Sequence, residues 1–154
     1  MASEPLLRLA QLADLTGIQA LYKVLRPDDV ELTAHRAQQT LHQLLTNPAI
    51  RLVVAEYAFQ PVATCMLAIV PGLVHNAQPF GIIEHVVTAE AYRGKGIGLS
   101  MMQFTLQLAW QADCYKVILL SGQQRATAHQ LYLRAGFDGD RERGFVIKNP
   151  LRKQ

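Results

Sequence analysis

The sequence has few of the features that mark secreted, membrane-spanning or metal-binding proteins. Its 2 cysteines, Cys65 and Cys114, are too far apart for a metal-ligand or redox motif. No apolar run approaches the roughly 20 residues of a membrane span, and the start, MASEPLLRLAQ, lacks the pattern of a secretory signal. We therefore expect a cytoplasmic protein with reduced thiols, no membrane partner and no bound metal.

Charged residues are also sparse, with 15 Lys and Arg against 12 Asp and Glu, a formal net charge of +3. The cations are dispersed, and aromatic residues do not alternate with them as along a nucleic-acid track. Nucleic acid is therefore not an expected partner. Hydrophobic residues make up 50% of the chain, which is enough for a buried core in a single domain covering residues 1–154. A homodimer is compatible with the sequence but is not decided by it.

Hydrophobic periodicity predicts one sheet with packed helices, in the order βααβββαβαβ. The expected helices cover residues 15–25, 34–46, 97–110 and 126–136. The expected strands cover 6–12, 50–58, 62–70, 82–88 and 115–122, and the terminal segment 137–150 is expected to form a hairpin or edge strands. Asp14 and Thr33 are expected to cap the first two helices. The pattern favours an α+β or mixed α/β domain.

The segment Arg93–Gly98, RGKGIG, lies between a buried strand and an amphipathic helix. It does not fit a Walker loop, because no Ser or Thr follows Lys95, and it lacks the third glycine of the dinucleotide fingerprint. Glycines let the backbone approach a ligand, and the first amides of a helix have no intrahelical acceptor. With two cations beside it, the turn predicts a pyrophosphate site. The alternative is a helix start whose glycines only permit close packing.

These residues resemble the GNAT superfamily of acetyl-CoA-dependent N-acetyltransferases. The family pattern [Q/R]-x-x-G-x-[G/A] is matched by Arg93–Gly98, and its second segment is matched by Ala128, Tyr132 and Gly136-Phe137. The resemblance implies an α/β (α+β) fold with a central mixed, mostly antiparallel sheet of six to seven strands. About four helices would flank the sheet, which would splay between strands 4 and 5. Arg125 departs from the family, which usually has Asn there.

The resemblance also implies an acyltransferase enzyme that transfers an acetyl group directly from acetyl-CoA to a primary amine. A backbone amide near Val87 would stabilise the oxyanion. The residues expected to bind the cofactor are Val86, Val87, Thr88, Arg93, Gly94, Lys95, Gly96, Ile97 and Gly98.

Three side chains are candidates for proton transfer. Tyr132 matches the family's acid, which would protonate the leaving thiolate, although a packed tyrosine is the alternative. Glu84 is a candidate base, because a carboxylate within an apolar strand must be paired, solvated or functional; a structural salt bridge is its alternative. His85 is a second candidate base, or a residue that is merely hydrogen-bonded. Strand alternation places Glu84 and His85 on opposite faces, and a water relay from either is equally compatible.

The expected acceptor is the amine of a small molecule. Two alternatives stay open. One is acetylation of a protein or peptide N-terminus or lysine, and the other is a non-catalytic module that binds acyl-CoA without turnover.

Overall fold

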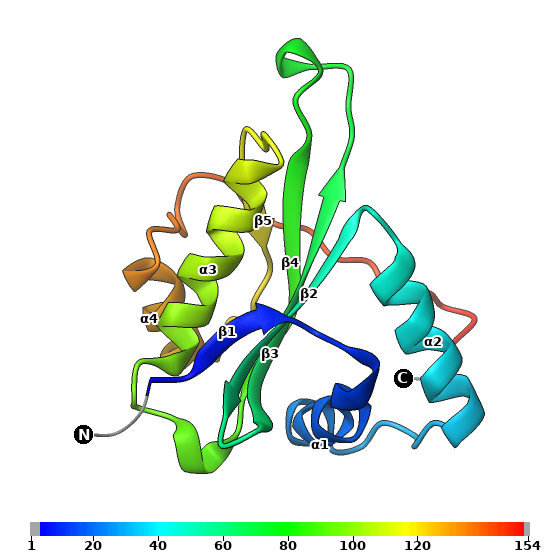
Figure 1. The fold of residues 1–154 in the computed structure, drawn as a ribbon. Coiled ribbons are helices and arrows are strands. Elements are labelled where there is room, and N and C mark those ends of the chain that lie inside the picture. The colour runs from blue at the N-terminus through cyan, green and yellow to red at the C-terminus, as the bar shows by residue number, and fades with distance from the viewer. Residues whose placement is uncertain (1–3, 153–154) are drawn as a thin grey trace. The chain divides into compact units, whose positions relative to one another are not determined.

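The computed structural model describes residues 4–152. Within this range the strands are β1 (Leu6–Leu9), β2 (Ile50–Tyr57), β3 (Gln60–Val70), β4 (Phe80–Thr88) and β5 (Val117–Leu119). The α-helices are α1 (Leu15–Leu25), α2 (Ala34–Thr46), α3 (Ile97–Gln111) and α4 (Ala126–Arg134), and short 3-10 turns cover Leu12–Asp14, His75–Ala77 and Glu90–Tyr92 (Figure 1). The expected order of elements is confirmed up to α4.

The chain divides into two compact units, residues 1–119 and 120–154. The first unit contains the whole sheet with α1, α2 and α3, and the second contains α4. No helix in the described part of the chain is long and apolar enough to cross a bilayer.

The sheet is mixed and mostly antiparallel, as expected. Its order is β1-β2-β3-β4-β5; the first four strands pair antiparallel, and β5 pairs parallel with β4. The expectation of six to seven strands is wrong for the described residues, which form five. The missing elements are those expected in 137–150, where the described chain has no strand and Phe145 and Ile147 are 86% and 95% exposed. Aromatic and β-branched residues favour a strand only where a neighbouring strand supplies pairing.

Pairing between β4 and β5 is short. Gly81, Ile82 and Ile83 lie opposite Val117, Ile118 and Leu119, and β4 then continues alone on that side to Thr88. Among the described residues, the edge of β4 from Glu84 to Thr88 therefore has no strand neighbour on the β5 side. This is the place where the resemblance implies an opening in the sheet.

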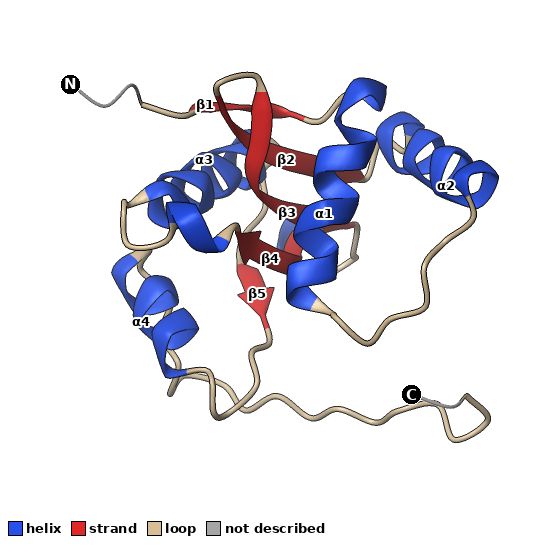
Figure 2. Ribbon diagram, turned by 90° about the horizontal axis from the view of Figure 1, so that it is seen from below, coloured by secondary structure: helices blue, strands red, loops and turns tan. Residues whose placement is uncertain are grey.

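Helices cover both faces of the sheet in the first unit, with α1 and α2 on one face and α3 on the other (Figure 2). Leu52 and Val54 of β2 point to the first face, where they pack with Ile18 and Leu41. Because side chains alternate along a strand, the residues on either side of Leu52 and Val54 in β2 point to the second face. α3 is amphipathic as expected, and its Ile97 and Met101 are buried.

An arginine joins β1, β2 and the start of α1. The guanidinium of Arg8 donates to both carboxylate oxygens of Asp14, at 2.7 and 2.9 Å, and to Glu56 at 2.6 and 2.8 Å. Asp14 also accepts the amide of Gln11 at 2.7 Å. The expectation that Asp14 caps the first helix is wrong, because Arg8 and Gln11 occupy its oxygens. Thr33 caps α2 as expected, accepting the amide of Arg36 at 3.3 Å.

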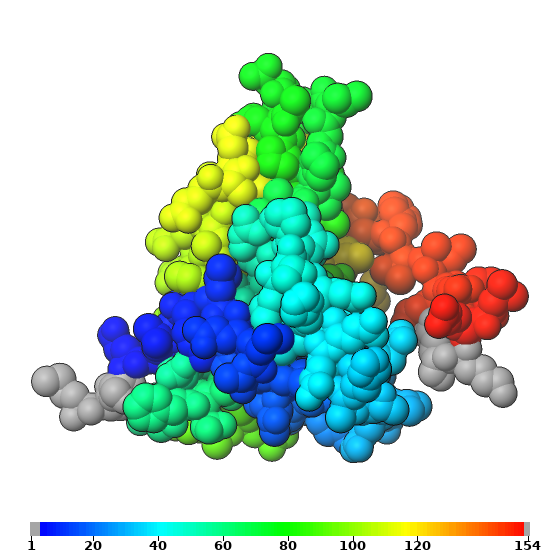
Figure 3. Space-filling view, turned by 45° about the vertical axis from the view of Figure 1, so that its right-hand side comes forward, coloured from blue at the N-terminus to red at the C-terminus, as the bar shows by residue number. Residues whose placement is uncertain are grey.

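The connection between β3 and β4, residues 71–79, projects beyond the neighbouring strands of the first unit (Figures 1 and 3). Leu73 and Val74 near its tip are 98% and 64% exposed. His75, Asn76 and Ala77 follow with positive φ values of 50°, 57° and 61°. Such conformations are uncommon for non-glycine residues. The ring of His75, in the middle of the connection, stacks on Tyr115 with centroids 3.9 Å apart.

Candidate functional site

The glycine turn is built by the backbone that leads from β4 into α3. Gly94 and Gly96 have φ values of +72° and +79°, in the left-handed region that favours glycine. A Cβ added to either residue would meet no atom within 4 Å. By contrast, a Cβ on Gly17 in α1 would lie 2.8 Å from the side chain of Pro61. The two turn glycines are therefore required by backbone conformation and leave open space above them, which disfavours the packing alternative.

Helix α3 begins directly after this turn, with Gly96 as its N-cap and no side chain capping it. Ser100 donates its amide to the carbonyl of Gly96 at 3.0 Å. The amides of Ile97, Gly98 and Leu99 precede this bond and have no acceptor within the helix. Together with the positive end of the helix dipole, they form a set of donors suited to an anion.

Two cations flank the turn, and both are exposed. The Nε of Arg93 donates to the carbonyl of Thr88 at 3.1 Å, which ties the turn to the end of β4. The Nζ of Lys95 lies 5.1 Å from the ring centroid of Tyr92, and that ring contacts Tyr57 at 5.4 Å. Neither cation forms a salt bridge within the described residues. Both can therefore offer charge-assisted bonds to an anionic ligand.

The strand before the turn contains a β-bulge. Thr64 of β3 lies opposite Val87, but Met66 lies opposite Glu84, so two residues of β4 face Cys65 alone. The extra residue is accommodated at His85, whose φ is +56°. Bulges and non-glycine residues with positive φ are concentrated at functional sites.

The bulge overturns the expectation that Glu84 and His85 point to opposite faces. Glu84 lies opposite Met66, which packs on the α1–α2 side of the sheet, and directly opposed residues share a face. The ring of His85 contacts Tyr22 of α1, with centroids 5.7 Å apart, so it lies on that side too. Regular alternation fails because His85 has a left-handed backbone. Both candidate bases can therefore serve one acceptor.

Both candidate bases are exposed. Glu84 forms no salt bridge or hydrogen bond with the described residues, so the structural salt bridge considered as its alternative is not made. Further along β4, Val87 is only 6% exposed, while Val86 and Thr88 are half-buried. Side-chain exposure along β4 therefore falls from Glu84 and His85, which are exposed, to Val87, which is buried close to the glycine turn.

Tyr132 lies in the second unit. It is on α4, is 7% exposed, and contacts the ring of Phe137 with centroids 6.2 Å apart. The amide of Phe137 donates to the carbonyl of Tyr132 at 3.0 Å, and Gly136, with φ of +100°, makes the turn that permits this bond. Arg125 precedes the helix, and its amide donates to the carbonyl of Gly122 at 3.1 Å. The proton-donor role of Tyr132 stays a prediction.

Comparison with known proteins decides the family. The model of the family described as "Acetyltransferase (GNAT) family" matches residues 18–137. The chain belongs to this family. The solved structure of an Agrobacterium tumefaciens str. C58 protein that is named as an acetyltransferase superposes with a TM-score of 0.89. The two sequences are 40% identical, and the match covers 94% of this chain and 99% of that one. The expected family and enzyme class, acyltransferase, are thereby confirmed.

Two curated relatives carry a more specific name. The glucosamine 6-phosphate N-acetyltransferase of Candida albicans is 38% identical over 38% of this chain and 39% of its own length. That of Trypanosoma brucei brucei is 31% identical over 47% of this chain and 52% of its own length. The matched segments therefore span only about half, or less, of these relatives.

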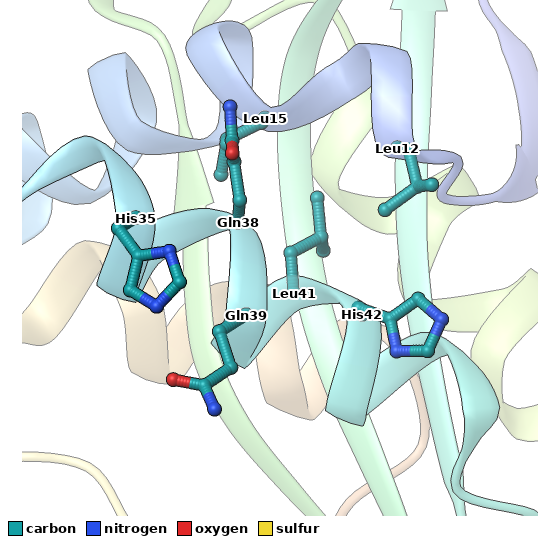
Figure 4. A pocket seen from close by; sticks show the side chains of 7 residues that line it. All are labelled: Leu12, Leu15, His35, Gln38, Gln39, Leu41 and His42. Carbon is teal, nitrogen blue, oxygen red and sulfur yellow. The ribbon is translucent and has the colours of Figure 1, made fainter.

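A separate hollow of about 470 Å³ lies between the start of α1 and one side of α2. Figure 4 shows Leu12, Leu15 and Leu41 around it, with the imidazoles of His35 and His42 and two glutamine side chains along α2. None of the site residues expected from the GNAT resemblance lines it. Within residues 4–152, no three His, Cys, Asp or Glu side chains gather as a metal site would require.

Sequence reasoning missed two features of this GNAT site. The bulge at His85 was not foreseen, because a β-rich sequence such as IIEHVVT carries no glycine to mark a positive φ. The contact from Tyr22 was not foreseen because it joins α1 to β4 across 63 residues of sequence. The only local signal was a polar Glu-His pair that interrupts an apolar strand.

Proposed function

We propose that this protein is an N-acetyltransferase that transfers an acetyl group from acetyl-CoA to the primary amine of a small molecule, by direct attack within a ternary complex. The observation that carries the proposal is the glycine turn, whose left-handed Gly94 and Gly96 open onto free amides at the start of α3. Family membership supports acetyl-CoA as the donor.

The turn residues fit the diphosphate of the donor. Amides from Ile97 to Leu99 would donate to its oxygens, while Arg93 and Lys95 would add charge-assisted bonds of about 1.5 to 3 kcal/mol each. The helix dipole would add on the order of 0.3 to 1 kcal/mol. The unpaired edge of β4, which includes Val86, Val87 and Thr88, would bind the rest of the molecule. Acetyl-CoA supplies the thioester that the amine attacks.

The protein's own residues would manage the protons. Glu84 or His85 would accept the proton of the attacking amine, directly or through a water, and both are exposed on the same side of the sheet. The backbone amide near Val87 would donate to the developing oxyanion. Tyr132 would protonate the leaving thiolate. An ammonium group must lose one proton before attack, because only the neutral amine is nucleophilic, and the attacking nitrogen must lose a second proton as the amide forms.

An amino sugar phosphate is the first acceptor to test. Its support is the name of the two curated relatives, which match 38% and 47% of this chain. The exposed Glu84 could contact the ammonium form of such an acceptor. Peptide N-termini and lysine remain the second acceptor class.

The test is release of the free thiol of coenzyme A from acetyl-CoA, measured with a panel of glucosamine 6-phosphate, an aminoglycoside, a polyamine and a short peptide. We expect amine-dependent release with at least one small molecule, and no more than background release with the peptide. Turnover only with the peptide would replace the small-molecule acceptor with a protein one. Binding of acetyl-CoA without turnover on any amine would support a non-catalytic module.

A further inference from the structure

Tyr22 links α1 to the bulge in β4. Its ring meets the imidazole of His85 at an interplanar angle of 69°. The ring of Tyr22 packs against the buried cluster formed by Ala10, Ile18, Leu41, Leu52 and Val54 on this face of the sheet. This packing fixes the position of the ring.

The imidazole of His85 has no comparable anchor of its own. Its side chain is exposed, and its ring contact with Tyr22 is the interaction that the described residues provide. A side chain on an extra, left-handed residue is not fixed by the alternation that orients its neighbours. The orientation of the imidazole is therefore set by whatever packs against it. Burial also raises the pKa of Tyr22 to about 12, so the phenol stays neutral beside His85 at any pH at which the enzyme would work.

We propose that Tyr22 is a positioning residue, which holds the imidazole of His85 beside Glu84 on the α1 side of the bulge. This inference rests on the proposed function, in which His85 or Glu84 accepts the proton of the amine. Tyr22 acts through His85 and does not itself touch the reacting atoms. Packing against the buried cluster keeps the ring of Tyr22 in place, and the ring restricts the imidazole from the side.

The effect of the Tyr22 ring can be separated from that of its hydroxyl by substitution. Tyr22→Phe keeps the ring but removes the hydroxyl, whereas Tyr22→Met fills similar space without an aromatic ring. An aromatic ring shifts the NMR signals of nearby protons, so the signal of the His85 imidazole reports the contact directly. The signal is assigned among the 5 histidines by its loss in His85→Asn, because Asn tolerates a positive φ better than most residues.

We expect Tyr22→Met to move the His85 signal toward that of an exposed histidine and to lower kcat by about tenfold, as expected when a reacting group is misplaced. The KM for acetyl-CoA should change by less than about twofold, because the glycine turn is untouched. Tyr22→Phe should retain the His85 shift and most of the turnover. A merely structural tyrosine would instead lower stability in both variants without this difference between them.

A double-mutant cycle gives the decisive comparison. If Tyr22 acts through His85, then Tyr22→Met should have no further effect on kcat once His85→Asn is present. Additive losses would overturn the positioning role, as would an unchanged His85 signal in Tyr22→Met. Should Tyr22→Met fail to fold, the NMR comparison is made with Tyr22→Leu in the presence of acetyl-CoA and with Tyr22→Phe. If the wild-type His85 signal is shifted by the Tyr22 ring but the protein turns over no amine, the proposed function is refuted, and the role of Tyr22 in catalysis with it.

Discussion

The polar side chains of this protein include some whose polar atoms are paired within the fold and others that form no salt bridge. Arg8 and Asp14 have their polar atoms paired with each other and with Glu56 or a backbone amide. Glu84 and Lys95 have no salt bridge within the described residues. A polar group that makes no structural bond but interrupts an apolar strand, as Glu84 does, is a stronger functional candidate than one that is already paired.

Arg8→Ala should lower the free energy of unfolding by about 3 kcal/mol, near the low end for breaking a buried ion pair. The side chain of Asp14 is only 7% exposed, so the substitution leaves a buried carboxylate without its cation. Arg26→Ala is the matched control, because its pair with Asp29 is 61% exposed on both sides; it should cost at most about 1 kcal/mol. Urea unfolding measures both. Equal losses would show that the Arg8 cluster is no stronger than a surface pair.

The contribution of Asp14 to stability should depend on pH. The hydrogen bonds from Arg8 hold the pKa of Asp14 below its ordinary value, against the opposing effect of burial. A depressed pKa stabilises the fold above the unfolded value, near 3.9, and this stabilisation is lost as pH falls through the folded value. The difference in unfolding free energy between wild type and Asp14→Asn should therefore shrink between about pH 5 and pH 2. A difference that stays constant across this range would contradict the assignment.

Tyr132→Phe should lower kcat more than it changes affinity for acetyl-CoA. Removing the phenolic hydroxyl leaves no side-chain proton for the thiolate, and general acid catalysis raises the rate by about 10²-fold or more. The ring contact with Phe137 survives in the variant, so packing within the second unit should be preserved. Steady-state rates and calorimetry measure the two effects. Equal turnover in the variant would reduce Tyr132 to a packing residue.

The secondary-structure elements were largely foreseeable from the sequence because their periodicity is strong. α1 covers the expected residues 15–25, and β2 and β3 lie where strands were expected over 50–58 and 62–70. Element ends and special backbone conformations were harder to foresee. The strand expected over 115–122 shortens to Val117–Leu119, since pairing with β4 and not local propensity sets its length. The bulge at His85 follows from long-range register, which no local pattern encodes.

The β2–β3 hairpin has an unfavourable turn. Tyr57 pairs with Gln60, leaving the two-residue loop Ala58-Phe59 with φ values of 49° and 63°. Two-residue hairpins with positive φ at both positions favour Asn-Gly. A non-glycine residue held at such a φ lowers the free energy of unfolding by on the order of 1 kcal/mol. Replacing it with glycine recovers only part of this, because glycine also gives the unfolded chain more conformational freedom.

Replacing Ala58-Phe59 with Asn-Gly should therefore raise the free energy of unfolding by about 1 kcal/mol. Phe59 is 90% exposed, so little packing is lost. Leu73→Gly is the control: Leu73 is 98% exposed and is not among the positive-φ residues, so the new glycine should give no gain. Chemical unfolding of the two variants provides the comparison. A loss of stability in the Asn-Gly variant would show that the present turn is not strained.

Across the whole chain, the family and its enzyme class could be inferred from two short segments, because the chemistry of binding a diphosphate restricts the residues at a helix start. The acceptor could not be inferred. Acceptor pockets are commonly built from loops, whose side chains follow no spacing rule. The number of strands was also overestimated, because Phe145 and Ile147 satisfy a strand pattern without having a strand beside them. Local composition predicts elements well where pairing is local, and poorly where it is not.

The central claim is that the open turn before α3 binds the diphosphate of acetyl-CoA. Calorimetric titration with acetyl-CoA of wild type, Gly96→Asn and Gly96→Asp tests it most directly. Both side chains enter space in which a Cβ meets no atom within 4 Å, at the same φ of +79°, so the two variants share any backbone strain. They differ in one negative charge. We predict that Gly96→Asp binds at least about tenfold more weakly than Gly96→Asn, a difference of roughly 1.4 kcal/mol. Equal affinity of the two variants would contradict the account.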